Sequence, residues 1–171
     1  MQDPRPLTTE PLAIDLVNTE WIQDGQRRDL LAEPEGVPTW LAAAGHPDAP
    51  RDRAALEGTR AAIRDVIDAG DPTPLNAVLA HGRLRERLGD GGPERALEVD
   101  DERWRVPWLA AQNLLELLRA GPDRIRRCGG DGCVLYFFDA SRGGRRQWCS
   151  MAGCGNRAKA RRHYERTRDA R

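Results

Sequence analysis

The chain has 171 residues, of which 39% are hydrophobic and 32% are charged, and its formal net charge is zero. This length suits one ordinary domain, or a medium domain joined to a small one. No apolar run approaches the ~18 residues of a membrane span, so the composition excludes helical membrane proteins. The zero average hides a division: residues 1–120 carry a net charge of −8 and residues 121–171 carry +8. Such a split indicates different roles for the two parts, or two surfaces that attract each other.

The first eleven residues, MQDPRPLTTEP, are polar and rich in proline. They predict a loose lead-in without a signal peptide, and therefore a cytoplasmic protein with no membrane partner. Apolar residues then recur at helical spacing, on rows that extend from Leu12 to Trp21. We expect a helix there, followed by a polar loop over residues 25–35.

Further helices are expected along the rest of this part. Residues 39–44 predict a short helix, and residues 51–69 predict a longer one with an apolar and a charged face. A third helix is expected over residues 74–88. The sequence GDGGP at 89–93 has the chemistry of a turn, and RALEV at 95–99 reads as a short strand. A β-hairpin around this turn is therefore an open alternative.

The helical pattern returns at Pro107 and continues to Ala120, where Gly121 and Pro122 end it. The sign of the charge changes at the same point. We therefore predict two domains, a helical one over residues 1–121 and a basic one over residues 122–171.

All four cysteines lie in one 27-residue stretch, as Cys128-x4-Cys133, fifteen residues and Cys149-x4-Cys154. Two such pairs suit four thiolates around one tetrahedral Zn²⁺. A reducing cytoplasm favours metal binding over two disulfides. Because four thiolates leave no open coordination position, we expect structural rather than catalytic zinc. His163 lies two helical turns further on and is expected to be an exposed helix residue rather than a ligand.

The residues around the cysteines predict a small β-hairpin and a helix. Residues 134–138 form a β-type run, Ser141-Arg-Gly-Gly is turn chemistry, and Gln147-Trp148 would return as the second strand. Residues 156–168 predict a basic helix. Knuckle, hairpin, second knuckle and helix follow the order of a treble-clef zinc finger. The expected fold is thus a mainly α N-terminal domain, with a short β-hairpin as an open addition, plus a small treble-clef-like zinc finger.

The basic residues of this module favour double-stranded DNA as the partner. Arginine pairs with phosphates bidentately and reads guanine edges, and asparagine pairs with adenine. The candidate DNA-binding residues come from the hairpin turn, the stretch after the last cysteine and the basic helix: Arg142, Arg145, Arg146, Asn156, Arg157, Lys159, Arg161, Arg162 and Arg166. Structural alternatives stay open. Asn156 could cap the helix, and Arg142 or Arg146 could hold the hairpin by pairing with Asp139 or with backbone carbonyls. The aromatic residues at 136–138 and 148 are expected to form the small core around zinc rather than to stack on bases.

Residues 1–121 offer fewer signals of function than the cysteine module. Asn18 and Trp21 are candidate ligand-binding residues, because Asp15, Asn18 and Glu20 are polar residues in an apolar setting. A hydrogen-bonding role for Asn18 in the core is the favoured alternative. The sequence holds no Ser/His/Asp arrangement, phosphate loop or His-rich cluster, so we do not expect an enzyme.

Several of these stretches resemble known families. CGNR at 154–157 is the signature of the CGNR zinc finger, and FDASR at 138–142 and RQWCSM at 146–151 resemble further motifs of that finger. LAIDLVNT at 12–19 is similar to the opening of the ABATE domain, which is described as a stress-induced transcription regulator and usually precedes such fingers.

The resemblance implies a bacterial transcription regulator with a C-terminal DNA-binding finger. It implies zinc ligation by the four cysteines and makes Asn156 and Arg157 signature residues without a fixed role. We expect the N-terminal domain to sense a small-molecule signal or to mediate homodimerisation. An RNA- or protein-binding module with purely architectural zinc is the alternative.

Overall fold

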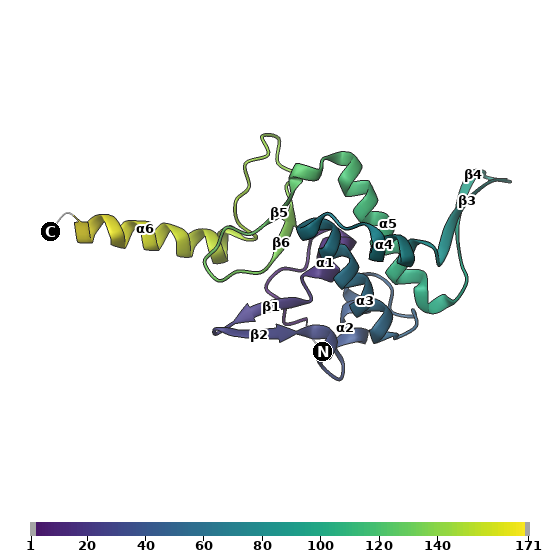
Figure 1. Cartoon of the computed structure of the whole chain (residues 1–171), viewed down its shortest axis with the longest axis horizontal. Coiled ribbons are helices and arrows are strands. Elements are labelled where there is room, and N and C mark those ends of the chain that lie inside the picture. Colours follow the sequence, from purple (N-terminus) through teal and green to yellow (C-terminus); the bar gives the residue numbers. More distant parts are fainter. Residues whose placement is uncertain (1–2, 170–171) are drawn as a thin grey trace.

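A computed structural model describes residues 3–169. A helical body lies at the centre of the molecule. An arm of two strands, β3 (Gly82–Gly89) and β4 (Gly92–Val99), projects at one end, and helix α6 (Asn156–Asp169) projects at the other (Figure 1). None of the helices within residues 3–169 is long and apolar enough to cross a membrane.

The body begins with helix α1 (Leu12–Val17), whose residues 13–17 are all buried. The expected helix stops there, and Trp21 lies instead on strand β1 (Glu20–Gln23), which pairs with β2 (Gln26–Asp29). The two residues between the strands, Asp24 and Gly25, both have positive φ, 51° and 74°. Positive φ at both central positions is typical of a tight hairpin turn. The polar loop predicted over 25–35 is therefore wrong for its first half, and a 3-10 turn (Leu30–Ala32) follows.

Three helices then build one side of the body: α2 (Gly36–Ala43), α3 (Arg53–Arg64) and α4 (Thr73–Leu79). The side chain of Asp52 accepts a hydrogen bond from the Ala55 N–H (2.9 Å) and caps α3. The helices predicted over 39–44 and 51–69 are confirmed, the second ending in a π turn at Asp65–Ala69.

The helix predicted over residues 74–88 is wrong beyond Leu79. Strand β3 (Gly82–Gly89) begins three residues later and pairs antiparallel with β4 (Gly92–Val99). At the start of β3, a Cβ on Gly82 would lie 2.9 Å from the Trp108 ring, so glycine allows this close approach. The alternative of a hairpin around 89–93 is confirmed.

Helix α5 (Arg105–Ala120) is the centre of the body and packs against α1, α3 and α4. Its buried stripe includes Trp108, Ala111, Leu114 and Leu117. The Asn113 side chain of α5 accepts the Ala13 N–H (3.1 Å) and thereby satisfies a free donor at the start of α1.

The basic module contains strands β5 (Ile125–Arg127) and β6 (Tyr136–Phe138), a π turn at Met151–Gly155 and helix α6 (Asn156–Asp169). Strand β6 pairs with β5, so the predicted pairing of residues 134–138 with Gln147–Trp148 is wrong. The Gln147 carbonyl instead accepts the Gly129 N–H (3.0 Å). The basic helix is confirmed, whereas the treble-clef topology stays a prediction.

The buried Asp139 explains how the chain returns from residue 141 toward Cys149 without pairing as a strand. Its carboxylate accepts the backbone N–H groups of Ser141 (3.0 Å) and Arg146 (2.9 Å) and closes the intervening loop. Hydrogen bonds from Ser141, and then from Arg146, lower the pKa of Asp139 against the opposing effect of burial. The loop is thus held by one ionised side chain.

The body and the basic module share one hydrophobic core. Leu135, Tyr136 and Phe137 belong to the same buried cluster as the residues of α1 and α5. Tyr136 and Phe137 are core residues as expected, at 4% and 0% exposed, but they belong to a core shared with the body rather than to a separate small core around zinc. The module therefore rests on the body through β6, which packs beside α1.

Candidate metal centre

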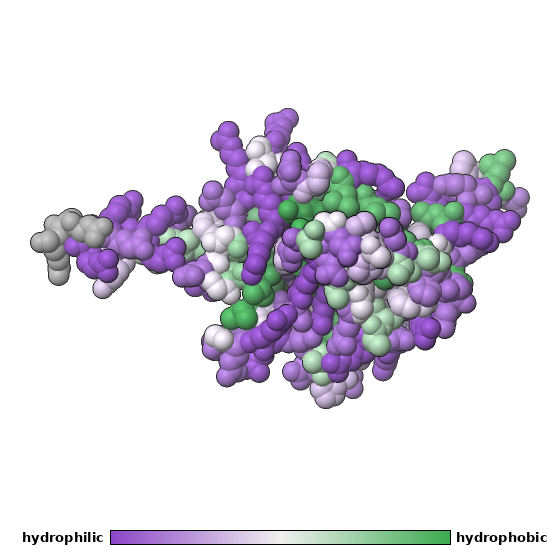
Figure 2. All heavy atoms as spheres, in the orientation of Figure 1, coloured by the Kyte–Doolittle hydropathy of each residue, from purple (hydrophilic) through white to green (hydrophobic). Residues whose placement is uncertain are grey.

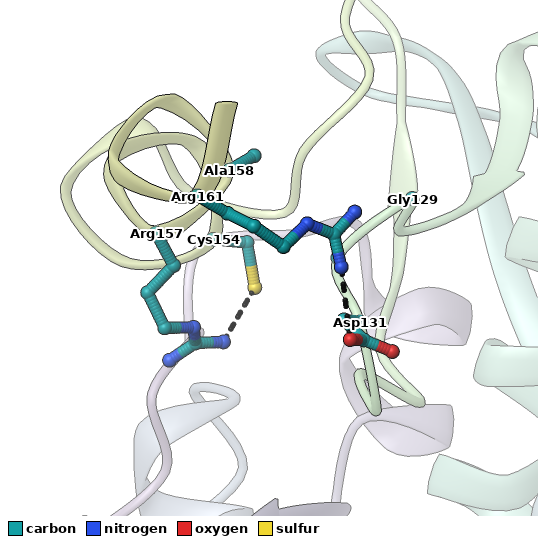
Figure 3. Close-up of a pocket in the computed structure, with 7 residues that line it drawn as sticks. Gly129, Asp131, Cys154, Arg157, Ala158 and Arg161 are labelled. Carbon is teal, nitrogen blue, oxygen red and sulfur yellow. Dashed lines mark hydrogen bonds and ion pairs between the residues drawn. The ribbon is translucent and has the colours of Figure 1, made fainter. Parts of the chain in front are cut away.

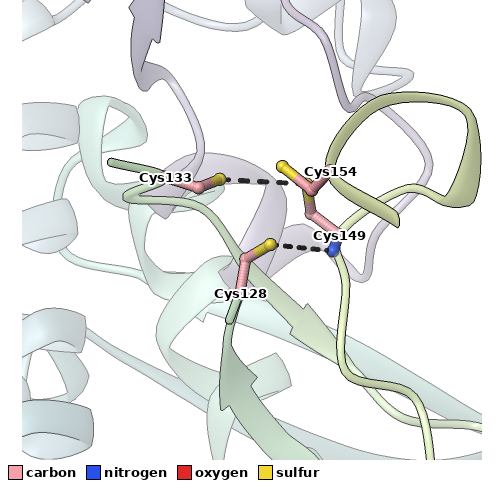
Figure 4. Close-up of side chains that lie close together, drawn as sticks. All are labelled: Cys128, Cys133, Cys149 and Cys154. Carbon is pink, nitrogen blue, oxygen red and sulfur yellow. Dashed lines mark hydrogen bonds between the residues drawn. The ribbon is translucent and has the colours of Figure 1, made fainter. Parts of the chain in front are cut away.

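The four cysteines converge on one point (Figure 4). Their sulfur atoms all lie within 4.8 Å of one another, and all four are free thiols. Two of the separations are 3.9 Å, between Cys133 and Cys149, and 3.6 Å, between Cys149 and Cys154. Four thiolates at the Zn–S distance of a tetrahedral site lie ~3.8 Å apart. The cluster therefore has the size and donor set of a metal site and is consistent with zinc.

The first two ligands come from the loop between β5 and β6. Cys128 follows β5 directly, and the turn reaches Cys133 through Gly132 at φ +67°. A Cβ on Gly130 would lie 2.8 Å from the Cys154 sulfur. Glycine at this position thus lets the first knuckle close against the opposite ligand.

The second pair comes from the segment before α6. Ser150 caps the π turn by accepting the Gly153 N–H (3.3 Å), and the turn presents Cys154 beside Cys149. Cys128, Cys149 and Cys154 are buried, and Cys133 is half-buried. Most of the surface of the four ligands is therefore covered by the protein.

Hydrogen bonds to the sulfur atoms favour their charged form. The Cys149 N–H lies 3.2 Å from the Cys128 sulfur, and the Arg157 guanidinium donates to the Cys154 sulfur (3.0 Å; Figure 3). The hydrogen bond with Cys149 lowers the pKa of Cys133 to about 5, whereas burial raises the pKa of Cys154 to about 11. Repulsion between like charges keeps the thiols from ionising together, and a divalent cation removes that repulsion.

Arg146, a candidate for DNA contact, is engaged within the protein. Its guanidinium donates to the carbonyls of Trp148 (3.0 Å) and Cys149 (2.7 Å), pairs with Glu10 (2.7 Å) and lies over the Phe137 ring (4.3 Å). These contacts join the second knuckle to the body, in agreement with the structural alternative for Arg146.

The other candidates for DNA contact are exposed. Arg142 and Arg145 lie in the loop before the second knuckle, and Asn156, Arg157, Lys159, Arg161, Arg162 and Arg166 lie on α6. Arg157 and Arg161 point back toward the metal centre, where Arg161 pairs with Asp131 (2.9 Å), and a cleft of about 300 Å³ lies between them and the first knuckle (Figure 3). The Asn156 side chain donates only a long hydrogen bond to the Ala152 carbonyl (3.4 Å). His163 is exposed on the same helix.

The candidate Asn18 joins the two parts of the chain. Its side-chain amide donates to the Tyr136 carbonyl (2.9 Å) and accepts the Tyr136 N–H (2.9 Å), and the residue is 0% exposed. This is the core hydrogen-bonding arrangement that the sequence favours as the alternative to ligand binding. Both amide groups are occupied by the module, so Asn18 acts as a clamp between β6 and the body.

Other contacts across this boundary have no local sequence signal. Glu10, expected in a loose lead-in, accepts the Phe138 N–H (2.9 Å), and Asp68 accepts from the Tyr136 hydroxyl (2.7 Å). Burial, followed by the hydrogen bond to Asp68, raises the pKa of Tyr136 to about 12. Three side chains from distant points of the body thus hold β6.

The candidate Trp21 lies beside a cavity next to the metal centre. The cavity has a volume of about 600 Å³, and its apolar wall includes Pro6, Trp21, Ile22 and Leu135. Cys133, Cys149 and Cys154 also line this cavity. The cavity therefore lies between the β1–β2 hairpin and the cysteine cluster.

Two family models match the chain. The ABATE model, described as "Putative stress-induced transcription regulator", matches residues 10–121, and the model of the CGNR zinc finger matches residues 124–167. The first match covers more than half of the chain. No curated protein matches it.

Proposed function

Because the chain belongs to the ABATE family and carries a CGNR zinc finger, we propose that it regulates transcription by binding double-stranded DNA. In this proposal Cys128, Cys133, Cys149 and Cys154 hold one Zn²⁺, which fixes the start of α6. The helix and the loop at 141–145 then contact DNA. Zinc supplies architecture only, because four thiolates leave no position for a substrate.

The observation that carries the proposal is the exposure of α6. The helix stands clear of the body (Figure 1), and at ~1.5 Å per residue its 14 residues are ~21 Å long, which suits the major groove. Among the described side chains, no carboxylate lies within ion-pair distance of Lys159, Arg162 or Arg166. These three cations are therefore available to phosphates without breaking an internal pair.

Exchange of these three residues for glutamate tests the proposal. Each phosphate contact contributes ~0.9 to the slope of log K against log salt, so the triple variant should lose about three units of slope and at least ~100-fold of affinity. The measurement is fluorescence anisotropy of labelled duplex DNA, with zinc-loaded protein at several salt concentrations.

A matched triple variant controls for net charge. Arg28, Arg51 and Arg119 are exposed on the body, and their exchange for glutamate changes the total charge equally. Equal losses from both triple variants would mean that total charge, not α6, governs binding. Tighter binding of RNA, or of an acidic protein, than of duplex DNA would favour the alternative binding module.

We further propose that the body senses a small, largely apolar effector in the cavity beside Trp21. Its volume lies within the range of ligand pockets, and its walls belong to both the body and the finger. An effector there would contact the β1–β2 hairpin and the knuckles at once. An enzyme would need free catalytic polar groups near this cavity. The carboxylates of Asp15 and Glu20 are instead held in ion pairs, Asp15 with Arg5 and Glu20 with Arg64. This occupation supports a binding protein rather than an enzyme.

A cavity-filling substitution tests the effector site. Ala152→Trp places an indole at the wall of the cavity, whereas Met151→Trp adds the same group at an exposed neighbour outside it. We expect the fluorescence enhancement of anilinonaphthalene sulfonate to be lost in the first variant and kept in the second. Retained enhancement in Ala152→Trp would rule out this cavity as the binding site.

A further inference from the structure

The arm formed by β3 (Gly82–Gly89) and β4 (Gly92–Val99) is firmly attached at its base. The Trp108 indole donates to the Leu79 carbonyl (2.9 Å) and lies against Gly82. His81 stacks on Trp104 with ring centroids 3.9 Å apart. Beyond these contacts the arm extends away from the body (Figure 1). Its direction is therefore fixed, although its far part touches little else.

The register of the arm separates two faces. On one face, Arg83, Arg85 and Arg87 all pair with Glu94 or Glu98 across the strands. The opposite face is mostly apolar, with Glu86 paired to Arg95 (2.6 Å) at its centre. Cross-strand partners lie on the same face, so the apolar side chains of this second face are those of Leu84, Leu88, Pro93, Leu97 and Val99.

The apolar face of the arm lies outside the core of the body. Leu88 is 83% exposed, whereas Leu84 and Leu97 are half-buried but belong neither to the core nor to the residues packed against it. Figure 2 shows hydrophobic surface on the arm among hydrophilic residues. A two-stranded hairpin is marginally stable in water, so burial of this face would stabilise the arm.

We propose that this face of the arm is the interface with a second copy of the chain. Two arms pack face to face about a two-fold axis, so that the leucines of each cover those of the other. An axis parallel to the strands brings Glu86 of each arm to the partner's Arg95, because these two residues lie opposite each other across the strands. Such self-complementarity is what an isologous interface requires.

The charges of the arm disfavour other partners. Residues 82–99 hold four arginines and four carboxylates, and every arginine of the arm is paired with a glutamate. A neutral arm offers no excess positive charge to nucleic acid. The ion pair at the centre of the apolar face would be costly in a lipid core. The inference does not depend on DNA binding, and it adds a defined dimer to the proposed regulator.

The expected dimer is weak. Eight residues at ~3.3 Å each and two strands ~5 Å apart give a face much smaller than the ~800 Å² per partner of stable complexes. We therefore expect dissociation constants in the micromolar range or above. Sedimentation equilibrium of the zinc-loaded full chain at increasing concentration should show a monomer–dimer equilibrium. A chain that stays monomeric at hundreds of micromolar would overturn the proposal.

Charge exchange across the interface tests which face is used. Glu86→Arg leaves two arginines on the apolar face, and Arg95→Glu leaves two glutamates. Each variant alone should self-associate at least about tenfold more weakly than the original chain, because like charges then meet across the axis. An equimolar mixture of the two should form a heterodimer, and this recovery shows that both variants fold. Absence of a heterodimer would contradict the proposal.

The opposite face supplies matched controls. Glu94→Arg and Arg87→Glu break an equivalent cross-strand pair and change the charge equally, but on the face that we expect to remain exposed. Dimerisation of these controls should match that of the original chain. If they weaken dimerisation as much as Glu86→Arg and Arg95→Glu do, the apolar face is not the interface.

Discussion

Replacement of Cys154 by serine is expected to abolish zinc binding and to unfold the chain from about residue 124 onward. Strands β5 and β6 have three residues each, too few to hold the module without the metal. Binding of structural zinc contributes ~10–16 kcal/mol in small zinc modules. Since Tyr136 and Phe137 belong to the common core, the loss should extend to the body and lower its melting temperature by on the order of 10 °C.

Zinc content per chain, measured by elemental mass spectrometry, and thermal melting by circular dichroism check this result. Met151→Ala is the matched control, because Met151 lies between Cys149 and Cys154 but is exposed. It should keep one zinc per chain. Full zinc occupancy in Cys154→Ser would show that Cys154 is not a ligand.

Zinc affinity should also fall as the pH falls. In the metal-free cluster the lowered pKa of Cys133, about 5, makes it a thiolate at neutral pH, whereas the raised pKa of Cys154, about 11, keeps it protonated. Binding of the metal therefore displaces protons, and acid opposes it.

Asn18→Leu is expected to destabilise the whole chain by ~4 kcal/mol. Leucine has a similar size but leaves the N–H and carbonyl of Tyr136 without partners in a site that excludes water. Each buried polar group left unsatisfied costs ~1–3 kcal/mol. Urea unfolding measures the change. Loss of the clamp should also shorten the lifetime of bound zinc, because Cys133 lies in the loop that leads directly into β6.

Asn76→Leu provides the comparison for this variant. The substitution is identical, but Asn76 is exposed on α4, and exposed positions usually change stability by less than ~0.5 kcal/mol. A cost below ~1 kcal/mol for Asn18→Leu would mean that the Asn18–Tyr136 pair is not an essential link between body and finger.

The metal centre could be predicted from the sequence because its signal is local. Equal C-x4-C spacings and glycines within the first knuckle are enough to indicate a thiolate cluster, with no need of residues elsewhere in the chain. The long helices α3 and α5 were equally predictable, since their apolar faces repeat over several turns.

The arm and the β1–β2 hairpin were harder to predict, for two reasons. The sequence of β3 alternates arginine with leucine or glutamate, which fits a strand, but these residues also favour helices. Trp21 continues the spacing of α1, although the Asp24–Gly25 turn reverses the chain. In the β1–β2 segment the turn at Asp24 and Gly25 decides the structure. In the arm it is Gly82, which allows close packing against Trp108.

The contacts between body and finger could not be predicted at all. Glu10, Asn18 and Asp68 reach β6 across 68 to 128 residues of sequence. No periodic pattern encodes such pairs, because each depends on how α1 and β6 meet in the folded chain.

The common core also determines whether the finger can fold outside this chain. An isolated fragment from residue 122 onward would expose the apolar side of β6, including Phe137 and Leu135, and should aggregate rather than fold. A transplant into another protein would have to carry α1 with it. Because β6 is clamped rather than tethered, α6 keeps one orientation relative to the body. In a dimer the relative position of the two bodies would then fix the distance between the two DNA half-sites. DNA with any other spacing would bind only one finger.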